Sequence, residues 1–219
     1  MGLTYNADIV FCIDVSGSMK LFSSLTRELS RFYEAYFHAC EKYGKNINEL
    51  RVRIIKFKDI YYDGKDSIRT TDFFLIPEEK HLLSKELENI VFEGGGEFEE
   101  NGLEALDLAM NSDWNFSGNR RRHIIVLWTD SGAHTLEKSK KYKPKHYPLN
   151  VANSLGELTD RWDEFHDNAK RLILFAPSHS PWEEIGASWE NTIFYPSKAG
   201  DGLTEVEFDE IISCLINSI

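Results

Sequence analysis

Oxygen-bearing side chains follow the first apolar segment of the sequence at every second position. Residues 8–13 (DIVFCI) lead into Asp14, Ser16 and Ser18, with Gly17 between the two serines. In extended backbone every second side chain points to the same side, so these three side chains can face one point. A carboxylate and two hydroxyls are hard oxygen donors, which suit Mg²⁺ or Mn²⁺ rather than zinc. The pattern therefore indicates a divalent-cation site, with the alternative that a serine caps the following helix and the aspartate accepts hydrogen bonds from loop amides.

A second apolar segment also ends in an acid. Residues 123–134 (HIIVLWTDSGAH) run through apolar positions to Asp130, which Ser131 and Gly132 follow. If both segments are parallel strands of one sheet, their carboxyl ends meet at the same edge, where ligands bind in folds of this kind. We therefore expect Asp130 to lie beside Asp14.

The elements that position these acids follow from the hydrophobic pattern. Short apolar runs predict strands, and longer stretches with apolar residues every three or four positions predict helices. The expected strands are residues 8–13, 52–57, 124–129, 172–176 and 192–195, with a short edge strand at 73–76. The expected helices are residues 22–40, 82–90, 102–110, about 152–168 and 206–216, and residues 138–149 are expected to form a long irregular loop.

This alternation of strands and helices predicts the fold class. Near-continuous apolar strands are typical of parallel sheets that helices cover on both faces. We expect an α/β fold with a doubly wound, mostly parallel, Rossmann-like sheet, helices on both faces and one short antiparallel edge strand. The chain of 219 residues is within the range of a single α/β unit, so residues 1–219 are interpreted as one domain.

Composition and charge restrict the function classes. Hydrophobic residues make up 42% of the chain, but no stretch approaches a membrane span, and the N-terminus lacks the pattern of a secretory signal. Cys12, Cys40 and Cys214 stand far apart among apolar residues, which indicates buried reduced thiols in a cytoplasmic protein. The net charge of -11 disfavours nucleic acid and anionic membranes as partners and is compatible with a site that collects a cation.

The two acidic motifs and their order resemble the von Willebrand factor type A domain. The metal-ion-dependent adhesion site of that family is built from an Asp-x-Ser-x-Ser loop after the first strand, a middle loop, and an aspartate after the fourth strand. Here DVSGS at residues 14–18 matches the first element and TDSG at residues 129–132 matches the last. The resemblance extends over nearly the whole chain, and it implies that Asp14, Ser16, Ser18 and Asp130 are metal ligands.

The middle loop, residues 93–106 (EGGGEFEENGLEAL), departs from the commonest family pattern because it contains no threonine. It resembles the form in which a glutamate precedes a Gly-hydrophobic-acid-Ala run, and this implies that Glu100 is the metal ligand that the middle loop contributes. Glu97 and Glu99 are expected to point elsewhere if a helix begins at about Glu100. The three glycines of this loop do not form a phosphate-binding loop, because no Gly-Lys-Ser/Thr follows them.

The glutamate changes the charge of the expected site. Asp14, Glu100 and Asp130 carry three negative charges against the two of the metal, whereas a threonine would leave the site neutral. An extra carboxylate weakens the attraction for an acidic partner unless one acid stays behind a water molecule. Either the site binds its cation tightly and its partner modestly, or one of the acids moves.

Three further clusters are expected to be less important. The arginines at 120–122 precede a strand and are interpreted as a solvated turn rather than a phosphate site. The five lysines between 138 and 145 follow the strand that leads to Asp130, so they should lie on the same face as the metal. Such a run of lysines is usually only solvated. In an acidic chain, however, it would steer an acidic or phosphorylated partner to this face. His134 and His146 are not expected to bind the metal, because hard oxygen donors dominate the site.

These features predict a non-catalytic protein-interaction module that binds an acidic side chain of a partner through Mg²⁺, with Mn²⁺ or Ca²⁺ as possible substitutes. The resemblance to intracellular bacterial A domains implies an AAA+ ATPase or a kinase and phosphatase pair as the partner. The alternative is a Mg²⁺-dependent phosphohydrolase of haloacid dehalogenase type with Asp14 as nucleophile. That chemistry requires a second aspartate two residues later, where this chain has Ser16.

Overall fold

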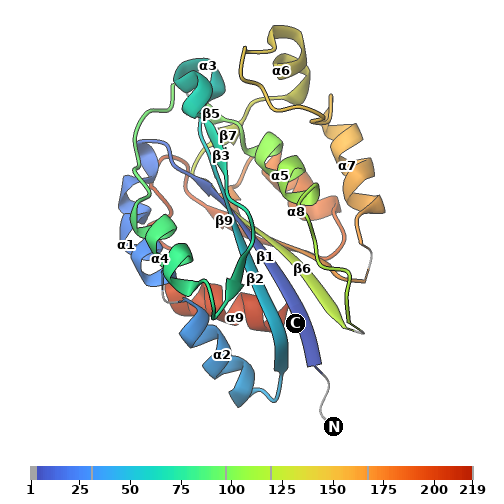
Figure 1. The fold of residues 1–219 in the computed structure, drawn as a ribbon. Helices are drawn as coiled ribbons and strands as arrows, with labels where there is room; N and C mark the ends of the chain where they lie inside the picture. The colour runs from blue at the N-terminus through green and yellow to red at the C-terminus, as the bar shows by residue number, and fades with distance from the viewer. Residues whose placement is uncertain (1–3, 31, 97, 119, 167, 219) are drawn as a thin grey trace.

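The computed structural model describes residues 4–30, 32–96, 98–118, 120–166 and 168–218, and in this part of the chain a seven-stranded sheet forms the centre (Figure 1). The strand order is β3-β2-β1-β6-β8-β9, and β4 also pairs with β2. The strands are β1 (Thr4–Asp14), β2 (Asn46–Phe57), β3 (Ile68–Thr70), β4 (Phe74–Ile76), β6 (Arg121–Trp128), β8 (Lys170–Pro177) and β9 (Thr192–Ser197).

The sheet confirms the predicted fold class, a mostly parallel Rossmann-like α/β fold. The strands β2, β1, β6, β8 and β9 pair in parallel and contain the strands expected from the sequence, except that β6 ends at Trp128 and the expected strand continued to residue 129. The edge strand predicted at 73–76 is β4, which is antiparallel to β2. A second antiparallel strand, β3, pairs with the other end of β2, so the outer edge carries two short antiparallel strands instead of one.

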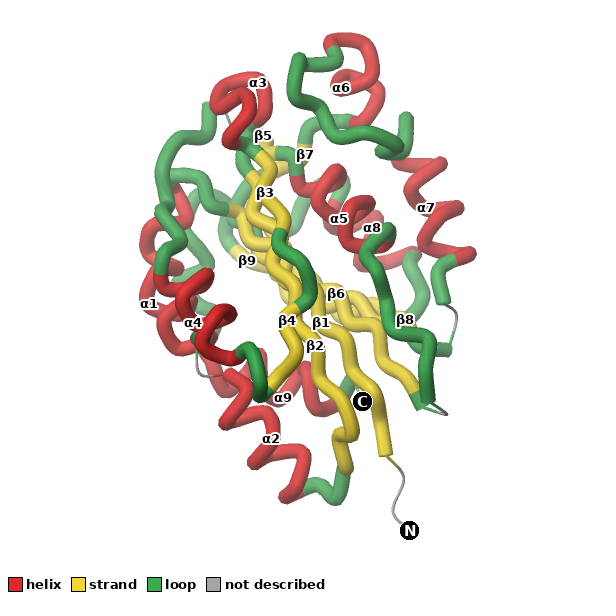
Figure 2. Tube along the Cα trace, in the orientation of Figure 1, coloured by secondary structure: helices red, strands yellow, loops and turns green. Residues whose placement is uncertain are grey.

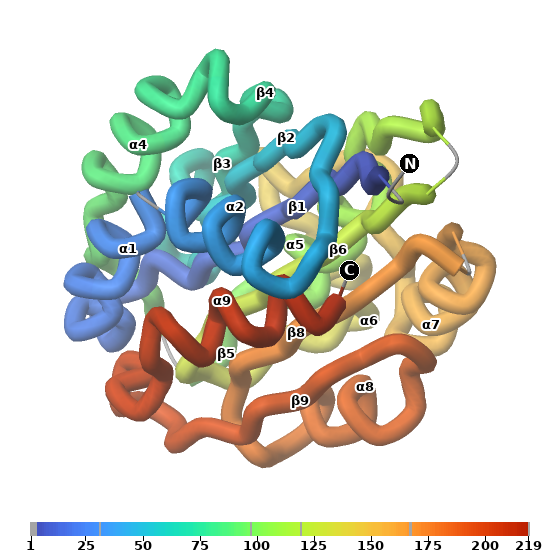
Figure 3. The backbone as a smooth tube through the Cα atoms, turned by 90° about the horizontal axis from the view of Figure 1, so that it is seen from below, coloured from blue at the N-terminus to red at the C-terminus, as the bar shows by residue number. Residues whose placement is uncertain are grey.

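Helices cover both faces of the sheet, as expected (Figure 1). The helices are α1 (Ser23–Leu29), α2 (Phe32–Lys42), α3 (Ile60–Asp63), α4 (Lys80–Glu88), α5 (Gly102–Met110), α6 (Leu136–Tyr142), α7 (Leu155–Glu164), α8 (Trp182–Ser188) and α9 (Phe208–Asn217). Successive residues of β1 alternate between two cores: Phe11 belongs to the core that contains buried residues of α1, α2, α4 and α9, whereas Val10 belongs to the core that contains buried residues of α5, α7 and α8. Figure 3 shows α9 alongside α2 on the first of these faces.

The single helix expected at 22–40 is wrong, because the chain forms a 3₁₀ turn at Ser18–Phe22 and then α1 and α2 as separate helices. The hydrophobic stripe was correctly identified, since its residues are all buried in the same core. Helix α1 ends at Leu29, and the carbonyl of Ser30 accepts a hydrogen bond from Ser84 Oγ of α4 at 2.7 Å. The contact with α4 thus occupies a carbonyl at the point where α1 ends.

Two other expectations on local structure need correction. The irregular loop expected at 138–149 begins with a helix, α6, because Thr135 caps it by accepting a hydrogen bond from the amide of Lys138 at 3.2 Å. The helix expected at about 152–168 is shorter, because Ser154 caps α7 by accepting from the amide of Glu157 at 3.1 Å. The helix expected at 102–110 coincides with α5.

A small second sheet lies beyond the carboxyl ends of the main strands (Figure 2). It consists of β5 (Glu99–Glu100) and β7 (Gly132–Ala133), which pair in parallel. Helices α3 and α6 lie at this same end of the molecule (Figure 2). In the described part of the chain, none of the helices has the length and apolarity required to cross a lipid bilayer.

Candidate metal centre

The first predicted loop brings a buried aspartate to the carboxyl end of β1. Asp14 is fully buried, and its Oδ1 accepts a hydrogen bond from the amide of Ser16 at 2.9 Å while its Oδ2 accepts one from Thr129 Oγ1 at 2.6 Å. The alternative interpretation of this loop is therefore correct for the aspartate, which does accept from a loop amide. It is wrong for the serines, because Gly17 occupies the N-cap of the 3₁₀ turn that begins at Ser18, and no side chain caps this turn.

The two serines of this loop connect it to the acid after β6. Ser16 Oγ lies 3.1 Å from Ser18 Oγ, and Ser18 Oγ donates to Asp130 Oδ1 at 2.9 Å. Asp130 is fully buried and also accepts from Ser131 Oγ at 3.2 Å and from the amide of Gly202 at 2.8 Å. Residues 112 positions apart in the sequence thus share one hydrogen-bonded cluster, as the strand-end argument predicted.

Glu100 reaches this cluster from the middle loop. Its side chain is buried, and its Oε2 has no hydrogen-bond partner among the described residues. The glycines of the loop make this approach possible, since Gly95 has φ +78° and a Cβ there would lie 2.6 Å from Glu100 Oε1. The amide of Gly17 donates to the carbonyl of Gly94 at 3.0 Å, which joins the middle loop to the first loop. A buried carboxylate oxygen without a donor is what a cation-binding position requires before the cation is bound.

A hollow of about 210 Å³ opens between these loops. Ser16, Ser18 and Glu100 line it, together with Phe98 and Ser131 and the backbone of the glycine-rich loop. The two aspartates are not among the lining residues, because the serine hydroxyls lie in front of Asp130 and the aspartates are fully buried. Direct ligation is therefore open to the serines and Glu100, whereas the aspartates would act through water or through the hydroxyls.

Burial makes this cluster unfavourable for negative charge. Burial, and then the neighbouring Asp14, raise the pKa of Glu100 to about 10. Burial raises the pKa of Asp14 to about 6, although hydrogen bonds from Ser16 and Thr129 lower it. Both shifts have the same cause, since desolvation penalises the charged form and carboxylates repel one another. A divalent cation in the hollow would compensate this charge.

The acids alone do not form a metal cluster. Within the described ranges, no group of three or more His, Cys, Asp or Glu side chains is placed to hold one metal ion. Cation binding would therefore depend on the serine hydroxyls as ligands. This donor set of hydroxyls and carboxylates suits a hard cation, and the unpartnered Oε2 of Glu100 fits that requirement.

The structure adds residues to the site that the sequence did not single out. Thr129 holds Asp14, and Gly202 holds Asp130 from the loop that follows β9. Gly202 has φ +61°, and a Cβ there would meet the carbonyl oxygen of Ser18 at 2.8 Å. Thr129 precedes Asp130 in the sequence, so its place in the site could have been predicted from the motif. Gly202 lies 72 residues from Asp130, and no nearby sequence pattern indicates that it contacts this acid.

The remaining candidates of the metal face have other partners. Glu99 is half-exposed and lies 3.0 Å from His134 Nδ1, so it points away from the hollow as expected, whereas Glu97 lies outside the described residues. His134 is buried, and its Nε2 lies 3.2 Å from Asp59 Oδ1. His146 is exposed. The helix expected to begin at about Glu100 begins at Gly102, because residues 99–100 form β5 instead.

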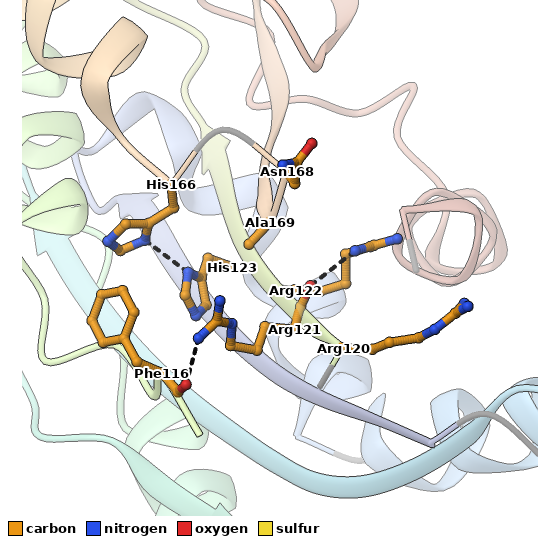
Figure 4. Close-up of a pocket in the computed structure, with 8 residues that line it drawn as sticks. All are labelled: Phe116, Arg120, Arg121, Arg122, His123, His166, Asn168 and Ala169. Atoms are coloured by element: carbon orange, nitrogen blue, oxygen red, sulfur yellow. Dashed lines mark hydrogen bonds between the residues drawn. The ribbon is translucent and has the colours of Figure 1, made fainter. Parts of the chain in front are cut away.

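The arginines at 120–122 lie at the amino end of β6 and line a separate hollow of about 510 Å³ (Figure 4). Their three guanidinium groups do not meet at one point: that of Arg121 points to the carbonyl of Phe116, whereas those of Arg120 and Arg122 extend to the other side (Figure 4), where each lies 5.5 Å from the centroid of the Tyr5 ring. Arg120 donates to Tyr5 Oη at 2.9 Å. The hollow also contains the contact between His123 Nδ1 and His166 Nδ1, at 2.7 Å. This divergence does not favour a phosphate site.

No family model and no curated protein match the sequence. Among solved structures, the fold is similar to that of the pilus adhesin SpaC from Lactobacillus rhamnosus GG, at 12% identity and a TM-score of 0.56. It is also similar to proximal thread matrix protein 1 from the mussel byssus, at 12% identity and a TM-score of 0.54. These matches cover 97% of this chain but only 30% of the adhesin and 48% of the mussel protein. At such identities the likeness concerns the fold alone.

Proposed function

We propose that this chain is a non-catalytic protein-interaction module of the von Willebrand factor type A kind, which binds partners through a divalent cation. The observation that carries the proposal is the convergence of Ser16, Ser18 and the unpartnered Oε2 of Glu100 on one hollow at the carboxyl end of the sheet. Asp14 and Asp130 lie directly behind the hydroxyls. Mg²⁺ is the cation this hard-oxygen set suits best, and Mn²⁺ and Ca²⁺ are the other candidates.

Exposed apolar side chains around the hollow support a protein as the partner. Leu21 is 65% exposed, Phe98 is 51% exposed, and Tyr62 is 71% exposed. Phe98 lines the hollow itself, and Leu21 lies beside Gly202 of the adjoining loop. Large apolar and aromatic groups of this kind contribute much of the binding energy at protein interfaces. One protein of similar fold is named as a pilus adhesin, so the fold is compatible with such a role.

The environment of Asp14 weighs against the alternative, a phosphohydrolase. A nucleophilic carboxylate must reach the phosphorus atom, but Asp14 is fully buried behind Ser16 and both of its oxygens accept hydrogen bonds. The position two residues later holds a serine, which cannot serve as the acid that protonates a leaving group. We therefore propose a module without catalytic activity.

The proposed cellular context rests on the resemblance of the sequence alone. Intracellular bacterial A domains are compact and act with AAA+ ATPases or with kinase and phosphatase pairs, and we propose a partner of this type in the cytoplasm. The buried free thiols of Cys12, Cys40 and Cys214 agree with a reducing compartment. The partner would contribute an acidic side chain to the cation.

The test is metal and partner binding by the wild type and by Asp14→Ala. Titration calorimetry with Mg²⁺, Mn²⁺ and Ca²⁺ should show binding to the wild type and a large loss in the variant, since Asp14 orients Ser16 through its amide. A pull-down with Mg²⁺ and with EDTA should show the same dependence. Equal metal binding by both proteins would refute the site. If the wild type hydrolyses phosphomonoesters and Asp14→Asn abolishes this activity, the chain is an enzyme and the proposal of an interaction module is refuted.

A further inference from the structure

A second hollow adjoins the candidate metal centre, between helices α3 and α6. It has a volume of about 500 Å³ and is lined by Asp59, Tyr61, Tyr62, Gly96, His134 and Lys138. Gly96 also lines the metal hollow, so the two hollows meet at the glycine-rich loop. A chain segment that places one side chain in the metal hollow can therefore continue across this second hollow.

Helix α6, which forms one wall of this second hollow, is held in place by hydrogen bonds and by a buried side chain. Ser139 Oγ donates to the buried Glu104 Oε1 at 2.8 Å, and Tyr147 Oη donates to the same oxygen at 2.9 Å. Tyr61 Oη lies 3.2 Å from Ser139 Oγ, which joins α3 to α6. Leu136 is buried in the core. The segment that follows β7 is thus a fixed support and not a freely moving loop.

The segment that contains α6, residues 136–145, is rich in lysine. Residues 136–145 contain five lysines and one acid, Glu137, in a chain whose net charge is -11. Lys140, Lys141, Lys143 and Lys145 are exposed and form no ion pair with a carboxylate of the described residues. The concentration of unpaired positive charge on one edge of an acidic protein creates a local field that attracts negative groups.

The two acids that line or adjoin this hollow already have partners within the protein. Asp59 Oδ1 accepts from the amide of Tyr61 at 2.8 Å and lies next to His134 Nε2. Glu99 lies 3.0 Å from His134 Nδ1 and 3.6 Å from Lys138 Nζ. Both carboxylates are therefore already paired within the protein. Lys138 is the only one of the five lysines with a carboxylate partner among the described residues.

We infer that the partner presents a segment with several acidic residues, one of which binds the cation while the following residues cross the hollow between α3 and α6 toward the lysines of residues 138–145. This inference rests on the proposed metal-dependent function and names the chemistry of the segment it recognises. The lysines speed association by steering and do not replace the metal contact. They also compensate the third carboxylate of the metal centre, which by itself would repel an acidic segment.

The test compares two lysine variants that change the net charge equally. The first variant is Lys140→Gln, Lys141→Gln and Lys145→Gln, and the control is Lys42→Gln, Lys80→Gln and Lys85→Gln on helices α2 and α4. The probe is a labelled peptide of alternating glutamate and glycine, with a matched peptide in which all glutamates but one are glutamine. Association and dissociation rates are measured with Mg²⁺ at about 50 mM and about 500 mM salt, where screening lengths differ severalfold.

For the glutamate-rich peptide at low salt, the first variant should associate about tenfold more slowly than the wild type and dissociate at nearly the same rate. The control variant should resemble the wild type, and high salt should remove the difference. Equal association rates of the two variants would overturn the inference, as would equal binding of the matched peptide. Comparable binding of single-stranded DNA would overturn it too, by assigning the lysines to nucleic acid.

The same measurements separate this inference from the proposed function. Asp14→Ala should lose peptide binding at both salt concentrations, whereas the first lysine variant should keep Mg²⁺ binding by calorimetry. Peptide binding that depends on the lysines but not on Mg²⁺ would refute the metal-dependent function. Peptide binding that depends on Mg²⁺ but not on the lysines would agree with the metal-dependent function and refute only the inference that the lysines attract an acidic segment.

Discussion

Replacement of Gly95 by alanine tests whether the glycine-rich loop holds Glu100 in a metal-binding position. Gly95 has φ +78°, and a Cβ there would lie 2.6 Å from Glu100 Oε1 and 3.0 Å from the Cβ of Ser16. A Cβ in ordinary van der Waals contact lies 3.4–4 Å from its neighbours, so the carboxylate oxygen of Glu100 must move by about 1 Å. The buried carboxylate would then leave the position in which it faces the serines.

Gly44→Ala is the matched control, because Gly44 has φ +66° and a Cβ there would meet nothing within 4 Å. Alanine in left-handed backbone costs about 1–2 kcal/mol, so both variants should lose about this much unfolding free energy without metal. In a domain of this size the melting temperature should fall by about 2–8 °C. The carboxylate at the tip of Glu100 can move at little further cost, but the Cβ of Ser16 must shift by a few tenths of an ångström, so Gly95→Ala should lose somewhat more stability than Gly44→Ala.

Metal affinity should distinguish the two variants. Ligand distances in metal sites tolerate changes of only about 0.2 Å, so Gly95→Ala should weaken Mg²⁺ binding by at least about tenfold, or about 1.4 kcal/mol. Gly44→Ala should bind Mg²⁺ like the wild type. Titration calorimetry measures the affinities, and denaturant unfolding measures the stabilities. If Gly95→Ala binds Mg²⁺ as tightly as Gly44→Ala, Glu100 is not a ligand and the reasoning from the loop geometry is wrong.

Three further predictions concern the cation, the charge of the site and pH. Mg²⁺ at about 100 times its dissociation constant should raise the unfolding free energy by about 2.7 kcal/mol in the wild type but not in Asp14→Ala, as scanning calorimetry would show. Glu100→Thr should bind Mg²⁺ more weakly than the wild type, but once saturated with metal it should bind an acidic peptide more tightly, because a negative charge is removed. Glu100→Gln should show the weaker Mg²⁺ binding with a smaller gain in peptide binding. Unchanged metal affinity in Glu100→Thr would exclude Glu100 as a ligand. Burial, and then His123, lower the pKa of His166 from 6.5 to about 4, so the unfolded chain binds a proton that the folded chain does not, and stability should fall as pH falls through this window. Denaturant unfolding of His166→Asn between pH 4 and 6.5 should show a shallower fall, and an unchanged slope would contradict this assignment.

The candidate site was partly predictable because some of its geometry is local. Asp14, Ser16 and Ser18 follow a strand at alternate positions, and Asp130 follows the neighbouring strand of a parallel sheet. Strand ends and the spacing of side chains along a chain depend on neighbouring residues only. The structure accordingly brings these four residues together with Glu100. Their role as metal ligands stays a prediction.

The hydrophobic pattern was more reliable for burial than for element boundaries. The stripe from Phe22 to Cys40 was correctly expected to face the core, but it continues across the break between α1 and α2. Periodicity reports which side of the chain is apolar, and two helices that pack on the same sheet retain the same stripe. The hydrogen bond from Ser84 to the carbonyl of Ser30, which lies where α1 ends, joins residues 54 positions apart and has no local signal.

The sequence by itself determined the parallel α/β fold, the edge of the sheet at which the acids gather and the identity of the strand-end residues, because periodicity and spacing encode these properties. Only the tertiary structure decided how the acids are used. It pairs β5 with β7, so Glu100 enters the hollow while Glu99 points to His134. It also brings Gly202 onto Asp130 and places Lys138 of α6 in the wall of the second hollow. These contacts join segments far apart in the chain, and their geometry depends on packing that no local pattern records.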